Sequence, residues 1–198
     1  MPERAPRKDA ARNRAAALAA ADRLFAGTVA GAGDPGDITM ADIAAAAGVG
    51  KGTLFRAFGD RTGLIRALHE SRLGPLTDAV ETGPPPLGPT TPPAQRVAAL
   101  LDALLCFKLD NRHLALALEG AGADSPYRAA HYERWHALLA GLLRAAPGTT
   151  AHDFTAHALL AATRADLVEH LAGAGDATRE ELRSGLAEFT ARVIGGAG

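Results

Sequence analysis

Apolar residues recur along this chain at spacings of three and four positions, and no stretch shows the sustained apolar and polar alternation with β-branched residues that marks a strand. Leu18, Ala21 and Phe25 share one face of a helix under this spacing, as do Leu186 and Phe189 near the C-terminus. Because the spacing continues through most of the chain, it predicts an all-α fold of about nine helices.

Glycine and proline divide the helical pattern into segments. The expected helices cover residues 8–27, 40–47, 50–58, a fourth that begins after residue 60, and then 94–111, 113–120, 126–146, 151–172 and 177–194. The fourth is expected to be disturbed at Gly74 and Pro75, because an internal proline removes a backbone hydrogen bond. Residues 83–93 contain six prolines, which exclude a helix and predict an extended connection.

Composition limits the classes of protein that these helices could form. The chain has 198 residues, of which 47% are hydrophobic, so it is long enough to bury a core, and its single cysteine excludes an internal disulfide. It has no signal-peptide pattern and no run of about 18 apolar residues. We therefore expect a soluble, cytoplasmic protein without a membrane span.

Charge is distributed unevenly between the two parts of the chain. The net charge is -1, but residues 1–72 hold 11 Lys and Arg against 8 Asp and Glu, a balance of +3, and residues 73–198 hold 10 against 14, a balance of -4. The basic part also contains the glycine-rich stretch GVGKGT, residues 48–53. This distribution favours an anionic partner, such as a nucleic acid, for the N-terminal part.

The stretch GVGKGT resembles two phosphate-binding motifs but satisfies neither. A P-loop would need glycine at Ala45 and serine or threonine at Gly52, and a dinucleotide motif would need glycine at Thr53 and a preceding strand. The preceding segment, ADIAAAA, consists mainly of strong helix formers. A helix therefore enters the turn, which argues against a nucleotide-binding loop.

A helix, a glycine turn and a second short helix make up a helix-turn-helix, in which the second helix enters the major groove of DNA. Thr39 is expected to cap the first helix together with Asp42, and Gly48 to turn the chain in a left-handed conformation. Gly50 and Gly52 would allow close approach to a duplex. An interhelical corner without a DNA role is the alternative interpretation.

The segment TMADIAAAAGVGKGTLFRAFGDRTGLIRALHE resembles the DNA-binding domain of the TetR family of bacterial transcriptional repressors, and the resemblance covers residues 12–70. It implies a helix-turn-helix DNA-binding domain over residues 1–59 and a helical ligand-binding and dimerisation domain over residues 60–198. It also implies a homodimer, paired through the helices near 151–172 and 177–194, that a small-molecule ligand releases from a double-stranded DNA operator. Such a protein is a regulator and not an enzyme.

The resemblance also implies which residues contact DNA. Arg56 is the first choice for reading a base, because its guanidinium matches the O6 and N7 atoms of guanine. Arg61 stands where the family has a phosphate-contacting lysine, and Phe55 where it has a tyrosine, so one hydrogen bond to the DNA backbone is missing. For Arg12 and Arg14, a solvated helix face explains the sequence equally well. The expected DNA-binding residues are Arg12, Arg14, Thr39, Gly50, Lys51, Gly52, Thr53, Phe55, Arg56 and Arg61.

The C-terminal part carries no ligand signature, but a mostly apolar cavity needs only a few polar or aromatic side chains to orient a ligand. The candidates for such contacts are Phe107, His131, Trp135, His157 and Arg164. Core packing or a surface position is the alternative for each of them.

Metal and catalytic motifs are absent from the sequence. His131 and His136 are five positions apart, as are His152 and His157, so neither pair shares a helix face in the manner of a zinc site. No nucleophile elbow occurs. We therefore expect no metal, no cofactor and no catalytic residues.

Two other functions remain open. One is a small helical nucleotide-binding protein or enzyme that uses GVGKGT, which nucleotide binding lost on Lys51→Ala would support. The other is a DNA-binding protein without a ligand, which a body without a cavity would favour.

Overall fold

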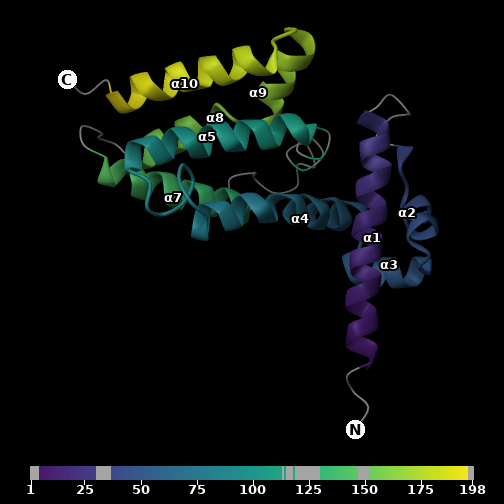
Figure 1. Ribbon diagram of the computed structural model, residues 1–198. Coiled ribbons are helices and arrows are strands. Elements are labelled where there is room, and N and C mark those ends of the chain that lie inside the picture. Colours follow the sequence, from purple (N-terminus) through teal and green to yellow (C-terminus); the bar gives the residue numbers. More distant parts are fainter. Residues whose placement is uncertain are drawn as a thin grey trace. The chain divides into compact units, whose positions relative to one another are not determined.

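A computed structural model describes residues 5–29, 37–112, 114, 118, 130–146 and 152–195, and every regular element within these ranges is helical, which confirms the all-α prediction (Figure 1). The chain divides into two compact units, Met1–Arg72 and Leu73–Gly198, which we call the head and the body. This boundary lies inside a helix, whereas the sequence suggested a boundary between residues 59 and 60. No described helix combines the length and the apolar character needed to cross a membrane.

The head contains three helices and the first part of a fourth. These are α1 (Ala5–Val29), α2 (Met40–Ala47), α3 (Lys51–Phe58) and the N-terminal part of α4 (Arg61–Thr82). α1 packs against both α2 and α3 (Figure 1). Ala17, Ala20 and Ala21 of α1 are buried together with Phe25, and their small side chains allow neighbouring helices to approach closely.

α4 is continuous although it contains a proline. It runs from Arg61 to Thr82 with Pro75 inside it, so the expected disturbance at Gly74 and Pro75 does not end the helix. Pro75 is exposed, whereas Leu73 and Val80 on the same helix are buried in the body core. Burial of these apolar side chains offsets the hydrogen bond that the proline removes.

The body packs its helices around one apolar core, in which leucine predominates. Its described elements are α5 (Pro93–Asp110), α7 (Ala130–Ala145), α8 (His152–Ala161), α9 (Ala165–Glu169), the π-helical turn η3 (His170–Ala174) and α10 (Arg179–Gly195). α5 packs against both α7 and α10, and α7 packs in turn against α8 (Figure 1). Asp102 of α5 and Arg183 of α10 form an ion pair of 2.7 Å between these helices.

The predicted single helix over residues 151–172 is wrong, because α8 ends at Ala161 and α9 begins only at Ala165. Thr163 lies buried in the intervening turn, where its hydroxyl donates to the Leu160 carbonyl at 3.0 Å. This bond satisfies a carbonyl at the end of α8, a local interaction that apolar periodicity does not reveal. The predicted helix over residues 113–120 and the first residues of the one over 126–146 lie mostly outside the described residues.

Candidate nucleic-acid interface

Side-chain hydrogen bonds define the start of α2. The Thr39 hydroxyl accepts a hydrogen bond from the Asp42 backbone N–H at 3.2 Å, and the Asp42 carboxylate accepts one from the Thr39 backbone N–H at 2.9 Å. This is the predicted capping box, which the structure confirms. Hydrogen bonds from the Thr39 hydroxyl and backbone lower the pKa of Asp42. The carboxylate therefore stays ionised at the helix N-terminus, where negative charge is favourable.

Gly48 defines the end of α2. It adopts a left-handed conformation with φ of 65°, as predicted, and its N–H is directed at the carbonyls of Ala44 and Ala45. After Val49, Gly50 caps α3 from an extended conformation, and its carbonyl accepts the Thr53 N–H at 2.9 Å. The helix-turn-helix expected from the sequence is thus present, and its turn depends on backbone geometry that glycine adopts readily.

α3 presents most of its surface outward. Of its 8 residues, Leu54 is the one that is buried. Lys51, Gly52, Phe55 and Arg56 are exposed, and Phe55 retains 48% of its accessible surface. A helix that buries so few side chains in the core of the head is able to contact a partner along most of its length.

Two polar residues of α3 are already in contact with each other. The Arg56 guanidinium donates to the Thr53 hydroxyl at 3.3 Å, since the two residues lie one helical turn apart. Together with Asn13 and Arg14 of α1, they line a groove of about 440 Å³ on the head. Asn13 was missed by the sequence interpretation, and the signal that could have found it is its place between Arg12 and Arg14.

The three remaining arginines of the predicted DNA contacts have partners within the head. Arg12 pairs with Asp9 on the exposed face of α1 at 2.8 Å. Arg14 lies over the Phe58 ring, 4.5 Å from its centroid, and donates to the Ala57 carbonyl at 3.1 Å. Arg61 donates to the Ile38 carbonyl at 3.0 Å. Arg14 and Arg61 therefore help to hold the head together, in addition to any contact with DNA.

Alanine substitutions at Gly48 and Gly52 are expected to change stability in opposite directions. At Gly48 the positive φ disfavours a Cβ, so Gly48→Ala should destabilise the head by about 1–2 kcal/mol. At Gly52, inside α3, an added Cβ meets no atom within 4 Å, so Gly52→Ala should stabilise the head by about 0.5–1 kcal/mol. Urea unfolding of both variants measures the difference. A loss of stability in Gly52→Ala would contradict the open position of this glycine.

The five predicted ligand-contacting residues are distributed over several helices of the body. Trp135 of α7 is 4% exposed in the apolar core, and Phe107 of α5 packs against that core. His157 of α8 forms a hydrogen bond of 2.6 Å with the Tyr132 hydroxyl, and Arg164 pairs with Asp166 at 2.9 Å. His131 lies half-buried in α7.

An apolar cavity of about 230 Å³ lies among α5, α9, η3 and α10. None of the five predicted ligand-contacting residues lines it. Its walls are formed by Leu105, Ala162, Leu167, Val168, Leu171, Glu181, Leu182, Gly185, Leu186 and Phe189. The structure therefore does not gather the five predicted residues around this cavity.

Comparison with known proteins places the head in a family. Residues 17–68 match the family model of bacterial regulatory proteins, tetR family. This range contains the last part of α1, all of α2 and α3, and the start of α4. No curated protein sequence matches the chain.

Solved structures support the fold over nearly the whole chain. A TetR-like transcriptional regulator from Rhodococcus sp. RHA1 is 21% identical, with a TM-score of 0.57, over 99% of this chain and 100% of that one. NalD of Pseudomonas aeruginosa, the secondary repressor of the MexAB-OprM multidrug efflux pump, is 19% identical, with a TM-score of 0.56, over 94% of this chain and 97% of that one. The head thus matches the tetR family of bacterial regulatory proteins over residues 17–68, and the chain as a whole shares the all-helical fold of these solved structures.

Proposed function

We propose that this protein is a transcriptional repressor that binds a specific DNA operator through α3. The observation that carries the proposal is the outward surface of α3, where Lys51 and Arg56 are exposed on a helix whose one buried residue is Leu54. Lys51 lies at the N-terminus of the helix, where backbone N–H groups also favour a phosphate. Arg56 lies further along and is suited to a guanine in the major groove.

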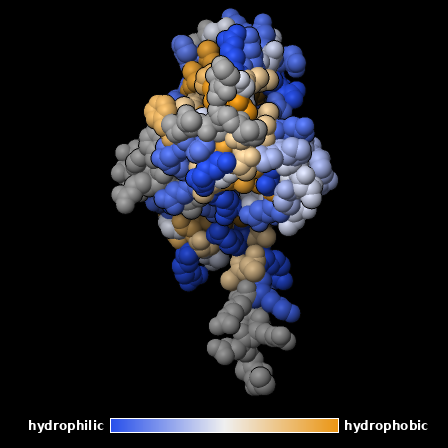
Figure 2. All heavy atoms as spheres, turned by 90° about the vertical axis from the view of Figure 1, so that its left-hand side faces the viewer, coloured by the Kyte–Doolittle hydropathy of each residue, from blue (hydrophilic) through white to orange (hydrophobic). Residues whose placement is uncertain are grey.

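Exposed apolar side chains support the proposal that the protein acts as a homodimer. Among the described residues of the body, the exposed large hydrophobic side chains are Phe154, Leu167, Leu171 and Phe189. All four lie within the two segments expected to pair, residues 151–172 and 177–194. Figure 2 shows hydrophobic surface among polar side chains in the upper part of its view. Such surface is typical of a protein interface.

The proposed regulation is an equilibrium between two conformations of the dimer. The operator-binding state holds two copies of α3 about 34 Å apart, one turn of DNA. A small molecule that prefers a body conformation with a different spacing would weaken operator binding by a coupling free energy of about 1–3 kcal/mol. The head would thus be the DNA-binding domain and the body the ligand-binding and dimerisation domain. The continuous helix α4 contributes residues to both units and is suited to transmit the change.

Fluorescence anisotropy with labelled DNA from upstream of the protein's own gene tests this function. We expect tight binding that weakens as salt rises and that a scrambled duplex does not compete away. Equal, weak binding to both duplexes would count against an operator in that region. A genomic selection for bound fragments would then decide whether any operator exists, and mononucleotide binding by GVGKGT would be tested alongside.

Replacing Phe55 by tyrosine is expected to strengthen binding to the operator. Phe55 is 48% exposed on α3, so the added hydroxyl costs no core packing and restores the phosphate contact that tyrosine makes in the family. One such hydrogen bond contributes about 0.5–1.5 kcal/mol, or roughly 2- to 12-fold in affinity. Anisotropy on operator and random DNA measures the change, and similar gains on both are expected because a phosphate contact is not sequence-specific. A weaker complex would show that Phe55 does not face the DNA backbone.

A further inference from the structure

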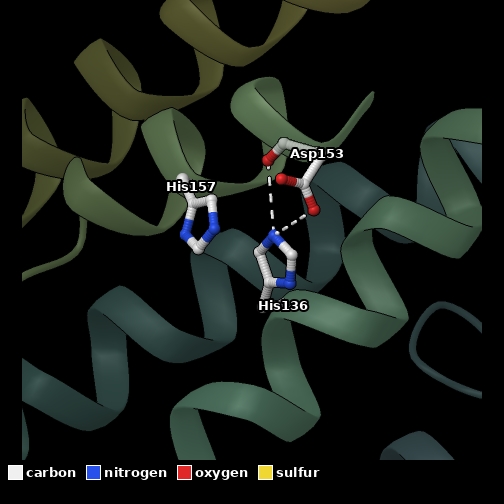
Figure 3. Close-up of side chains that lie close together, drawn as sticks. All are labelled: His136, Asp153 and His157. Carbon is white, nitrogen blue, oxygen red and sulfur yellow. Dashed lines mark hydrogen bonds and ion pairs between the residues drawn. The ribbon is translucent and has the colours of Figure 1, made fainter. Parts of the chain in front are cut away.

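Two histidines and an aspartate converge where α7 packs against α8. His136 comes from α7, and Asp153 and His157 come from α8 (Figure 3). One potential metal-ligand atom from each of the three residues lies within 4.8 Å of the other two. The His136 and His157 rings are stacked, with centroids 3.9 Å apart. The cluster thus joins donors from two helices that are separated in the sequence.

The separation of two donors already suits a metal ion. The His136 Nε2 atom lies 3.3 Å from an Asp153 carboxylate oxygen and also 3.3 Å from the Asp153 backbone carbonyl oxygen, a contact that a bound metal ion would replace (Figure 3). In a tetrahedral site with ligand bonds of about 2.0–2.1 Å, neighbouring ligand atoms are about 3.4 Å apart. Asp153 and His157 are also spaced four residues apart, so both lie on one face of α8.

A third interaction orients His157. Its Nδ1 atom is hydrogen-bonded to the Tyr132 hydroxyl at 2.6 Å. When a histidine binds a metal through one ring nitrogen, a hydrogen bond at the other nitrogen fixes the ring and its tautomer. Tyr132 is in the position of such an outer partner.

The cluster is accessible to an ion from solvent. The Asp153 side chain retains 82% of its accessible surface, whereas that of His136 retains 18%. Packing therefore restrains His136, whereas the exposed Asp153 carboxylate is able to rotate. Because the two imidazole rings are stacked, one of them has to turn for both to coordinate the same ion. Asp153 also lies in the first turn of α8, where a negative charge is favoured.

We propose that His136, Asp153 and His157 bind a divalent transition-metal ion of the zinc class, with Tyr132 as a positioning residue. Two imidazoles and one carboxylate form a donor set typical of Zn²⁺ and its neighbours, whereas Mg²⁺ and Ca²⁺ prefer oxygen ligands alone. Three protein ligands leave one coordination position for water or an exogenous ligand. The proposal does not depend on DNA binding, because all four residues lie in the body.

Titration of the full-length, tag-free, chelator-treated protein with Co²⁺ tests the site, since bound Co²⁺ absorbs visible light and Zn²⁺ should displace it. We expect saturable binding of one ion per chain. His136→Ala, His157→Ala and Asp153→Asn should each lower affinity by more than about 100-fold, since ligand loss exceeds the 10- to 100-fold effect of outer partners. Tyr132→Phe should lower it by about 10- to 100-fold.

Two controls keep the result interpretable. His170→Ala removes an exposed histidine outside the cluster and should leave binding unchanged. Asp153→Asn alters an exposed side chain, so its helical content, measured by circular dichroism, should match that of the unmodified protein. No saturable Co²⁺ binding, or binding that Asp153→Asn and both histidine variants retain, would overturn the proposal.

Discussion

Replacing Phe189 by aspartate is expected to convert the protein from a dimer to a monomer. Phe189 is 41% exposed on α10 and lines the same apolar cavity as Leu167 and Leu171, which are also exposed. In the proposed dimer this surface is buried, so Phe189→Asp places a carboxylate in an apolar interface. The cost is at least about 3 kcal/mol, which raises the dimer dissociation constant by more than about 100-fold. Size-exclusion chromatography with light scattering at several protein concentrations measures this change in the dimer dissociation constant.

The matched control places the same charge elsewhere on the body. Ala137 is an exposed residue of α7, outside the two segments expected to pair, and Ala137→Asp should leave the dimer intact. Because Phe189 is partly exposed in the single chain, Phe189→Asp should retain its helical circular dichroism spectrum. The monomer should also lose operator affinity, because one head makes half of the contacts. A stable dimer of Phe189→Asp would exclude this face of α10 as the interface.

The helix ends in the head could be predicted where interactions between residues close in sequence determine them. Thr39 and Asp42 cap each other within one turn, and Gly48 adopts the left-handed conformation that ends α2. Both signals depend on residues at most three positions apart, so the sequence alone contains them. The bounds of α2 and α3 followed from these signals, with Gly50 as the cap instead of the first residue of α3.

Features that depend on contacts between distant residues could not be predicted in the same way. The bond from Arg61 to the Ile38 carbonyl joins residues 23 positions apart, so no local pattern indicates it, and the phosphate contact expected of Arg61 stays a prediction. Histidine spacing within one helix does not reveal the metal-ligand cluster, because His136 meets Asp153 and His157 across the packing of α7 on α8. The four-residue spacing of Asp153 and His157 is the one local signal for this cluster, and it pairs a carboxylate with a histidine instead of two histidines.

Arg56→Ala is expected to reduce discrimination between the operator and other DNA. Arg56 is exposed on α3, and its bond to the Thr53 hydroxyl restrains the guanidinium on the outward face of the helix. Loss of a bidentate hydrogen bond to guanine should cost about 1–3 kcal/mol of binding free energy on the operator, which lowers affinity by a factor of roughly 5 to 150. The affinity for random DNA should change much less, since there the substitution removes only the electrostatic attraction between the guanidinium and the DNA phosphates. Fluorescence anisotropy with both duplexes at the same salt concentration gives the ratio of the affinity for the operator to that for random DNA.

Arg61→Ala provides the comparison, because this residue is expected to contact phosphate and not a base. It should weaken binding to operator and random DNA by similar factors. It should also lower the melting temperature, because the Ile38 carbonyl loses its guanidinium partner. Arg56→Ala has no such carbonyl partner to release in the described structure and should melt close to the unmodified protein. Equal losses of affinity for both duplexes in Arg56→Ala would show that Arg56 contacts the DNA backbone. Base recognition would then have to come from other exposed residues of α3, of which Lys51 is the first to test.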